Sequence, residues 1–502
     1  MKNLLILSDM HVGRDCNEIT GFKQERPNPE FDQAFIKLLN HYTTGQETNW
    51  KLVIGGDFID FMEVVVVPSD ESKFGMAVSF EVTDEEREFG LGSEAERVLI
   101  KLERTFRYHI EFFERLSQFV KDGGELVLVR GNHDVEFFWP KVQRVFRRNL
   151  SDLAYSEISF EVDEAIELRA SFQDRINFED WFYFEEGRVY LEHGNQYDTY
   201  CSFDHWLYPV SPYNPRRIDT PVSLFAMRYF VNILADFSPH NADYWSFKDY
   251  IAWLRAKKAS ELFYVAKTAL GTVYRLLEYA VRWSLGNVRA YQKEHQKALK
   301  ALSDEKNIPL PKLKQIDQQR HVPVSRNLPE LMRLLFLDRF LLVLGTLGLC
   351  AFWFLVLDFG WILILCLLAT IGIGLRVNQL LVPRRYFLPG PKQALAAKKI
   401  AKILGVPYVV MGHSHQPRRA KLDRHSVYLN TGCWLPGGKK DQNQTEESFQ
   451  DGPILCHLVI DQTNQAELRA FDPDRISWSV ADVPSEKSLI DLPIISIAPP
   501  AG

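Results

Sequence analysis

The sequence predicts an α/β protein, because short buried strands alternate with amphipathic helices in the first and last parts of the chain. Two further observations shape this prediction: potential metal ligands follow the strands, and a long apolar run divides the pattern. The 502 residues are 46% hydrophobic and 25% charged, with a formal charge of -6. This composition excludes a disordered chain or a small disulfide scaffold, and its mild acidity argues against a dedicated nucleic-acid-binding protein.

The first part of the chain, residues 1–200, contains most of the predicted sheet. Strands are expected where short apolar runs end in polar residues, at Asn3–Leu7, Leu52–Ile54 and Glu125–Val129, with a hairpin at Phe182–Glu192. Helices are expected where apolar residues recur at helical spacing, at Phe31–His41, Ser93–Val120 and Glu136–Asn149.

Residues 201–335 differ in character and predict a helical, basic and aromatic cap inserted into the sheet protein. Residues 248–302 have a helical pattern, and residues 241–340 contain 18 Lys and Arg against 10 Asp and Glu. The local charge of +8 contrasts with -6 for the whole chain, which indicates a face for an anionic surface or ligand. A solvated helical face is the alternative.

Residues 336–385 predict a transmembrane helical hairpin. The run Phe340 to Leu375 contains one charge, Asp358, near a turn at its middle, and two short spans fit into it. Basic residues flank both ends, which places both ends, and the parts of the chain that precede and follow the run, on the cytoplasmic side of a cell inner membrane or other membrane. The alternative is a buried helical hairpin in a soluble domain. The flanking residues are Arg333, Arg339, Arg376, Arg384 and Arg385.

After the apolar run the strand and helix pattern returns over residues 386–472. A helix is expected at Pro391–Leu404, with a proline near its start and Gly405 after its end. Residues 473–502 contain several prolines and little periodicity, so we expect a loose C-terminal tail. The remaining strands of the core are expected at Tyr408–Met411, Ser426–Leu429 and Ile454–Ile460.

Potential metal ligands follow five of the predicted strands. The crevice beyond the carboxyl ends of strands is where ligands bind in open α/β sheets, so we expect these side chains to converge. Oxygen and nitrogen donors without a thiolate suit Mn, Fe, Zn or Mg better than a structural cysteine-type zinc site. The glycines beside them let the backbone turn and approach the ions without a Cβ. The ligands are Asp9, His11, Asp57, Asn132, His193, His413 and His415.

These motifs resemble those of the calcineurin-like metallophosphoesterase superfamily. The pattern D-x-H, G-D-x-x-D, G-N-H-D/E, H and G-H-x-H is complete in this sequence and covers residues 1–200 and about 390–460. The resemblance implies a four-layer αββα sandwich and a dinuclear metal centre with Asp57 as the bridging ligand. One ion would be held by Asp9, His11, Asp57 and His415, and the other by Asp57, Asn132, His193 and His413.

The resemblance also implies the reaction, the hydrolysis of a phosphate ester or pyrophosphate bond by a metal-bridging hydroxide. His133 would be catalytic, stabilising developing charge or protonating the leaving oxygen, with Asp134 orienting it. Asn132, His133 and Arg130 would contact the substrate, although Arg130 is equally compatible with a structural ion pair. We expect Asp60 to support a ligand from behind rather than to bind metal.

The substrate depends on the insertion between His193 and Gly412. One branch, the UDP-2,3-diacylglucosamine hydrolases, is distantly similar: it inserts a helical cap there and acts on a membrane lipid. That branch usually has Arg where this chain has His133, and it is shorter and lacks a spanning hairpin. From the apolar run, the basic cap and this distant similarity, we expect a phosphate-containing substrate, lipid-linked or nucleotide, at a membrane surface. A phosphoprotein phosphatase or nuclease is the alternative, and a metal-binding scaffold without activity is the least supported.

Overall fold

A sheet of seven strands contains the three strands predicted near the N-terminus. The protein was studied as a computed structural model, which describes residues 1–13, 16–20, 28–43, 49–68, 80–156, 162–234, 237, 247–286, 288–335, 337–381, 389–434, 455–473 and 477–480. The sheet has the order β14-β13-β12-β1-β2-β3-β4. Its neighbouring strands are parallel from β1 to β4 and antiparallel elsewhere. The strands are β1 (Asn3–Leu7), β2 (Trp50–Gly55), β3 (Glu125–Val129), β4 (Ile176–Glu179), β12 (Leu455–Ile460), β13 (Ala466–Asp472) and β14 (Ser477–Val480).

A second sheet of five strands has the order β10-β11-β9-β6-β5. The predicted hairpin is confirmed, since β5 and β6 are paired and antiparallel. The strand order brings β6, before the cap, beside β9, after the hairpin, in parallel. The sheet therefore joins the two parts of the chain that the insertion separates. Its strands are β5 (Phe182–Glu185), β6 (Val189–Glu192), β9 (Tyr408–Met411), β10 (Pro417–Lys421) and β11 (Val427–Thr431).

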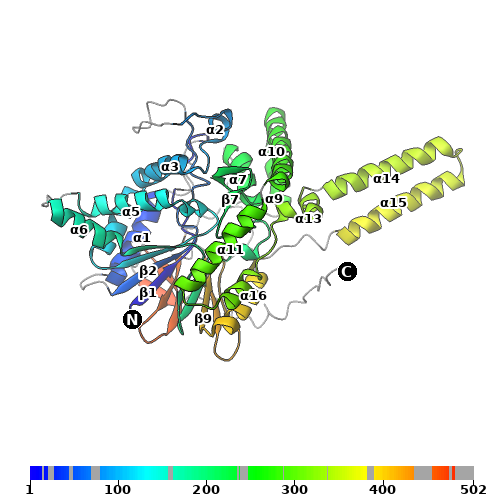
Figure 1. The fold of residues 1–502 in the computed structure, drawn as a ribbon. Coiled ribbons are helices and arrows are strands. Elements are labelled where there is room, and N and C mark those ends of the chain that lie inside the picture. Colours follow the sequence, from blue (N-terminus) through cyan, green and yellow to red (C-terminus); the bar gives the residue numbers. More distant parts are fainter. Residues whose placement is uncertain are drawn as a thin grey trace.

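The two sheets pack face to face through a buried apolar layer. Ile6 and Val53 of the first sheet belong to the same core cluster as Leu191 and Val410 of the second. A separate core lies between the seven-stranded sheet and its helices, and another between the five-stranded sheet and its helices. The α/β prediction is confirmed, and the layers follow the order helix, sheet, sheet, helix (Figure 1). The outer helices are α1 (Asn28–Thr43), α3 (Ala95–Tyr108), α4 (Ile110–Lys121) and α5 (Pro140–Ala154) on one side, and α11 (Val288–Glu305), α12 (Leu310–Asp317) and α16 (Pro389–Leu404) on the other.

Two predicted helices differ from the observed ones. The segment Ser93–Val120 was expected to be one helix, but α3 and α4 are separated at His109, whose φ of -114° and ψ of 42° are not helical. The reason is tertiary: His109 Nδ1 bonds the Asp32 carboxylate at 2.8 Å, and its Nε2 accepts the Gly13 N–H at 3.1 Å. The helix expected from Glu136 starts instead as a 3₁₀ turn, η2 (Val135–Phe138).

The described residues between 201 and 335 include a two-stranded ribbon followed by helices. The ribbon precedes a run of helices in which α10 is the longest. Arg217 and Arg228 of this region pair with Glu85 on α2 (Asp84–Phe89), at 3.0 and 3.5 Å. These ion pairs attach the insertion to the core. The elements are β7 (Val210–Ser211), β8 (Asn214–Ile218), α7 (Val222–Tyr229), η4 (Val231–Ile233), α9 (Phe247–Arg255), α10 (Ala259–Leu285), η5 (Val324–Arg326) and α13 (Leu328–Leu334), besides α11 and α12.

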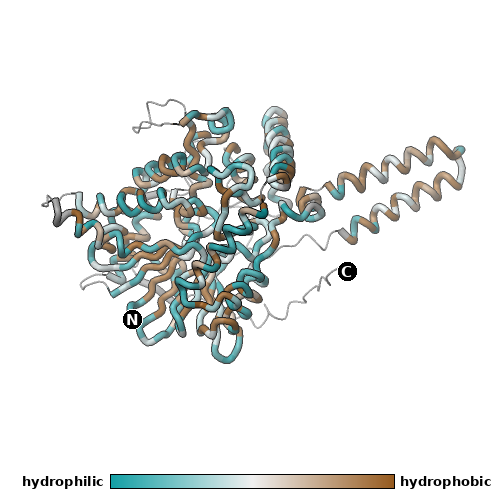
Figure 2. The backbone as a smooth tube through the Cα atoms, viewed as in Figure 1, coloured by the Kyte–Doolittle hydropathy of each residue, from teal (hydrophilic) through white to brown (hydrophobic). Residues whose placement is uncertain are grey.

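Two apolar helices, α14 (Leu337–Val356) and α15 (Trp361–Leu381), pack against each other and project away from the body of the protein (Figure 1). Figure 2 shows hydrophobic residues along both of them. No side chain of α14 is buried, and in α15 only Leu363 and Thr370 are, so among the described residues the hairpin does not form the buried core helices that the alternative expected. Each helix includes a 20-residue segment that is long and apolar enough to cross a membrane, by length and composition only.

The C-terminal segment is partly ordered, contrary to the expectation of a loose tail. Ser477–Val480 forms β14, which pairs with β13 at the edge of the seven-stranded sheet. The alternation of Ser and larger residues is too short to have predicted an edge strand. The rest of residues 474–502 lies outside the described residues.

Candidate metal centre

All the predicted metal ligands lie at the carboxyl ends of strands from both sheets. Five of the seven described non-glycine residues with positive φ are among them, with φ between 46° and 65°. This conformation costs a non-glycine residue about 1–2 kcal/mol, so the surrounding fold must enforce it. Backbone strain of this kind is typical of functional sites. The five residues are Asp9, His11, Asp57, His413 and His415.

The first group of ligands consists of Asp9, His11 and His415. His415 Nε2 lies 3.3 Å from Asp9 Oδ1 and 3.2 Å from His11 Nε2. Asp9 and His11 are buried, and His415 is 18% exposed at its side chain. The three donors lie close enough together to hold one ion.

The second group consists of Asp57, Asn132, His193 and His413. His193 Nε2 lies 3.1 Å from both Asp57 Oδ2 and Asn132 Oδ1. Asp57, His193 and His413 lie close enough together to hold an ion. Asp57 Oδ2 also lies 3.9 Å from His11 Nε2, so Asp57 stands between the two groups as a bridging ligand must.

The chemistry of these donors fits cations. His193 Nδ1 bonds the Gly55 carbonyl oxygen at 3.0 Å, and His11 Nδ1 bonds the Asp60 carboxylate at 2.8 Å. Because these oxygens can only accept, both Nδ1 atoms carry hydrogen, which leaves Nε2 of each ring to face the other donors. Each Nε2 lies at short range from carboxylate, amide or imidazole groups, and a cation can replace a proton on Nε2 and satisfy all of these groups. A second ring nitrogen bonded to a carbonyl or carboxylate is also typical of metal-binding histidines.

The electrostatics of the site agree with this interpretation. Burial lowers the pKa of His11 to about 4, so it is neutral, as a metal ligand requires. Burial also lowers the pKa of His193, but the carboxylates of Asp57 and Asp9 outweigh it and raise that pKa to about 9. The carboxylates therefore create a negative potential at the point where the ligands meet.

Two motif glycines are required by close approach of the ligand side chains. Gly56 has a φ of 92°, and a Cβ at this position would overlap the ring of His193. A Cβ on Gly412 would overlap the carboxylate of Asp9. The expectation that glycine lets the backbone approach the site without a Cβ agrees with both contacts.

His133 lies beside the ligands, with its side chain 14% exposed, and its partner is Asp60. Its Nδ1 lies 2.8 Å from Asp60 Oδ2, and its backbone N–H donates to Asp57 Oδ1 at 2.8 Å. Although burial lowers the pKa of His133, Asp60 and Asp57 raise it to about 10. Asp60 thus contacts both His11 and His133, which agrees with its predicted supporting role.

Asp134 has a different role from the one predicted. Its two carboxylate oxygens accept the backbone N–H groups of Phe58, at 2.7 Å, and Gly131, at 2.5 Å. It therefore ties the loop after β2 to the loop after β3, while Asp60 orients His133. Adjacency in the sequence predicted another partner for His133. Asp134, which follows it, bonds backbone N–H groups, whereas Asp60, which follows β2, contacts the imidazole ring.

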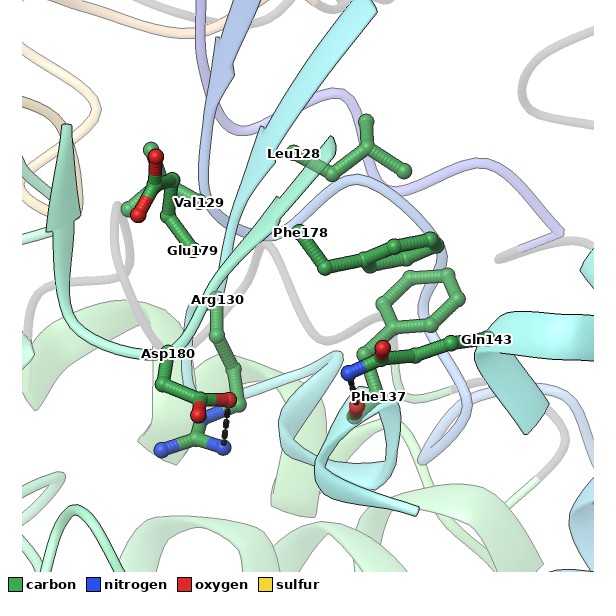
Figure 3. A pocket seen from close by; sticks show the side chains of 8 residues that line it. All are labelled: Leu128, Val129, Arg130, Phe137, Gln143, Phe178, Glu179 and Asp180. Atoms are coloured by element: carbon green, nitrogen blue, oxygen red, sulfur yellow. Dashed lines mark hydrogen bonds and ion pairs between the residues drawn. The ribbon is translucent and has the colours of Figure 1, made fainter. Parts of the chain in front are cut away.

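Arg130 does not join the ligands. It is 3% exposed, its guanidinium pairs with Asp180 at 3.1 Å and donates to the Trp206 carbonyl at 2.7 Å, and it stacks on the Trp206 ring. Figure 3 shows the pair with Asp180. Of the two roles considered from the sequence, the structural ion pair is the one that these contacts support.

Two residues of the site were missed. Asp198 Oδ2 lies 3.2 Å from His413 Nε2. The sequence signal was that Asp198 ends the segment His193–Asp198, which resembles the fourth motif of the UDP-2,3-diacylglucosamine hydrolases, but no role in the site was assigned to it. Lys101, on α3, is 3% exposed and donates to the Phe61 carbonyl at 2.7 Å, which fixes the turn that carries Asp60. A lysine on an amphipathic helix normally indicates solvent, so no sequence signal could have found it.

Comparison with known families identifies the class of protein that this fold and site define. The sequence profile of the Calcineurin-like phosphoesterase family matches residues 2–260, about half of the chain, and the protein belongs to this family. Members are typically dinuclear metal hydrolases, and the buried His and Asp groups fit such a site. The match includes the first four motifs, and the fold adds His413 and His415 from the last. No curated protein and no solved structure gave a match.

Proposed function

We propose that the protein is a membrane-anchored, dinuclear metal-dependent phosphohydrolase. It hydrolyses a phosphate ester or pyrophosphate bond of a lipid-linked or nucleotide substrate presented at the membrane surface. The reaction is proposed from the family and the convergent ligands. The location is proposed from the hairpin and from the way its two ends are attached to the metal centre.

The attachment of the hairpin carries the proposal. Before α14, the N–H groups of His321 and Val324 donate to the carbonyls of Gln196 and Thr199, at 2.8 and 2.9 Å. These carbonyls belong to the loop that begins at the ligand His193. After α15, the side-chain amide of Gln393 on α16 donates to the Gly412 carbonyl, next to the ligand His413, at 3.2 Å. Segments that precede and follow the hairpin in the chain are therefore bonded to the loops that carry the candidate ligands, and this supports a substrate presented at the membrane surface.

The charges around the hairpin support its orientation. Arg333 and Arg339 lie before the apolar segment of α14, and Arg376 lies near the end of α15. An excess of Arg and Lys marks the cytoplasmic ends of membrane spans. We therefore place both helix ends, the cap and the catalytic domain on the cytoplasmic side.

The residues of the chain have separate tasks in the proposed reaction. Two divalent ions of Mn, Fe, Zn or Mg, when bound, would neutralise phosphoryl charge and activate a water molecule. Asp9, His11, Asp57 and His415 would hold one, and Asp57, Asn132, His193 and His413 the other. His133 is placed to bind the phosphoryl group or to give a proton to the leaving oxygen, and Asp60 keeps its ring oriented.

The experiment compares substrates with and without a bilayer. The full-length protein, loaded with Mn²⁺ and reconstituted in vesicles, is assayed on a lipid pyrophosphate, a nucleotide diphosphate sugar, a phosphopeptide and single-stranded DNA. The proposal expects hydrolysis of the lipid-linked or nucleotide pyrophosphate above the other two. Preferred turnover of the phosphopeptide or DNA would instead support the phosphatase or nuclease alternative. Resistance of the protein to carbonate extraction tests the hairpin separately, because inserted helices are not electrostatic attachments.

A further inference from the structure

Helix α10 has a stripe of exposed apolar side chains along one side. Phe263, Leu270, Tyr274 and Leu285 are 73%, 70%, 68% and 81% exposed. Neighbouring members are about two, one and three helical turns apart, which places all four on the same face. Single exposed apolar residues are normal on a soluble surface, but a continuous stripe of this kind marks an interaction surface.

The opposite face of α10 is fixed in the cap, so the stripe cannot turn inward. Val265, Leu276 and Tyr279 are buried in the cap clusters. The hydroxyl of Tyr279 donates to the carboxylate of Asp219 and accepts the backbone N–H of Thr220, the latter at 2.9 Å. Helix α10 therefore has apolar side chains on its packed face and also on its exposed face.

The position of α10 favours a lipid surface as the occupant. Its C-terminal half shares an apolar cluster with α13, the helix directly before the hairpin: Leu276 and Trp283 belong to the same cluster as Leu331. Figure 1 shows α10 beside α13 and near the start of α14, running crosswise to the hairpin. A bilayer that contains the hairpin would therefore lie near α10.

The charge of α10 and its flanks matches anionic lipid headgroups. From residue 255 to residue 289 the sequence contains seven Lys and Arg but only Glu261 and Glu278 as acids. Lys258 is the N-cap residue of α10, and Lys267 lies between Phe263 and Leu270. An apolar stripe with basic neighbours is the pattern of helices that lie in the interface of a membrane.

We propose that α10 is an interfacial helix, with the stripe of Phe263, Leu270, Tyr274 and Leu285 contacting the surface of an anionic bilayer. This inference rests on the proposed membrane hairpin. The hairpin alone leaves the protein free to tilt about its base. A second contact at α10 fixes the orientation of the metal centre over the headgroups.

Photo-crosslinking of the full-length protein tests the contact. The variants Phe263→p-benzoylphenylalanine and Leu270→p-benzoylphenylalanine are reconstituted in vesicles of phosphatidylcholine and phosphatidylglycerol and irradiated, and the masses of the products are measured. We expect phospholipid adducts at both positions. The control is the same substitution at Lys297 of α11, whose side chain is 71% exposed, where we expect none. A covalent dimer would indicate that the stripe contacts a second copy of the chain, and the absence of any adduct would indicate that the stripe faces water. Either result overturns the inference.

Two double variants test whether the apolar stripe itself makes the contact with the anionic bilayer. Leu270→Glu combined with Tyr274→Glu changes only exposed positions, so the fold is retained, and we expect loss of the lipid adduct at position 263. Gln292→Glu combined with Gln296→Glu on α11 adds the same charge and should leave the adduct unchanged. An undiminished adduct in the first pair overturns the inference. Carbonate extraction of the same vesicles separates the two proposals: a chain that resists extraction without forming adducts refutes the α10 contact alone, whereas an extracted chain refutes the hairpin.

Discussion

The candidate metal centre and the hairpin differ in what fixes their side chains. At the metal centre the side chains are buried or nearly so, and each is fixed by other protein groups, as His11 is by Asp60 and His193 by Gly55. In α14 no side chain is buried, and length and composition alone distinguish the helix. The protein determines the geometry of the first region, whereas the surrounding solvent must determine that of the second.

This difference explains where the fold carries strain. Asp9, His11 and Asp57 keep positive φ angles because neighbouring strands and loops bond their backbones, for example His11 N–H to the Asp57 carbonyl at 2.9 Å. The hairpin has no comparable constraint, and a bilayer would provide the apolar surroundings that its exposed side chains need. Substitutions at the metal centre should therefore act on metal and turnover, and their effects should decrease with distance from the ions.

The largest effect is expected from Asp57→Asn. Asp57 stands between the two ligand groups, so loss of its charge should weaken both metal sites together and reduce turnover of a generic phosphodiester to background. Metal content and turnover are measured on the purified full-length protein. The control is Asp84→Asn, at a fully exposed carboxylate on α2, which should behave as wild type. Two bound metals and normal turnover in Asp57→Asn would refute the bridging assignment.

His133→Ala should separate chemistry from metal binding. A group that acts on the leaving oxygen is worth about 10²–10⁴ in rate, so kcat should fall while metal content and KM stay nearly unchanged. The loss should be smaller for nitrophenyl esters, which need little protonation, than for alkyl esters. His425→Ala, at an exposed histidine, is the control. Equal losses on both ester types, with metal retained, would indicate phosphate stabilisation without proton transfer, and loss of metal would contradict the assigned role.

Asp60→Asn and Asp134→Asn test which carboxylate orients His133. Asp60 contacts the rings of His11 and His133, so its substitution should lower kcat by about 10- to 100-fold, the range of residues that support a metal ligand. Asp134 accepts two buried N–H groups, so its substitution should cost about 1–3 kcal/mol of stability. Thermal unfolding and turnover are measured for both. A larger kinetic defect in Asp134→Asn, with unchanged stability, would restore the role first predicted from the sequence.

Two glycines with nearly the same backbone conformation provide the smallest and most controlled comparison. Gly56 and Gly123 have φ angles of 92° and 96°, so alanine should strain both by about 1–2 kcal/mol. Around Gly123 a Cβ meets nothing within 4 Å, whereas at Gly56 it would overlap His193. We expect both variants to lose stability and only Gly56→Ala to lose metal. Equal metal content in the two would show that the close approach to His193 does not matter.

The convergence of the candidate ligands was predictable from the sequence, because their residue types and their positions after strands restrict the alternatives. Asp9, His11, Asp57, Asn132, His193, His413 and His415 all reach the site. The partners of His133 and Arg130 were not predictable, because Asp60, Asp180 and Trp206 reach them through tertiary contacts that spacing does not encode. The same reason applies to His109, where a bond to Asp32 ends a helix that periodicity continues.

The central claim, that five separate strand ends form one dinuclear metal centre, is tested most directly by the metal stoichiometry of the active protein. Full-length protein, purified in detergent and dialysed against Mn²⁺, is analysed by elemental mass spectrometry beside its turnover of a phosphodiester. The account predicts two ions per chain and turnover that disappears and returns with them. One ion or none in a folded, active protein would contradict it.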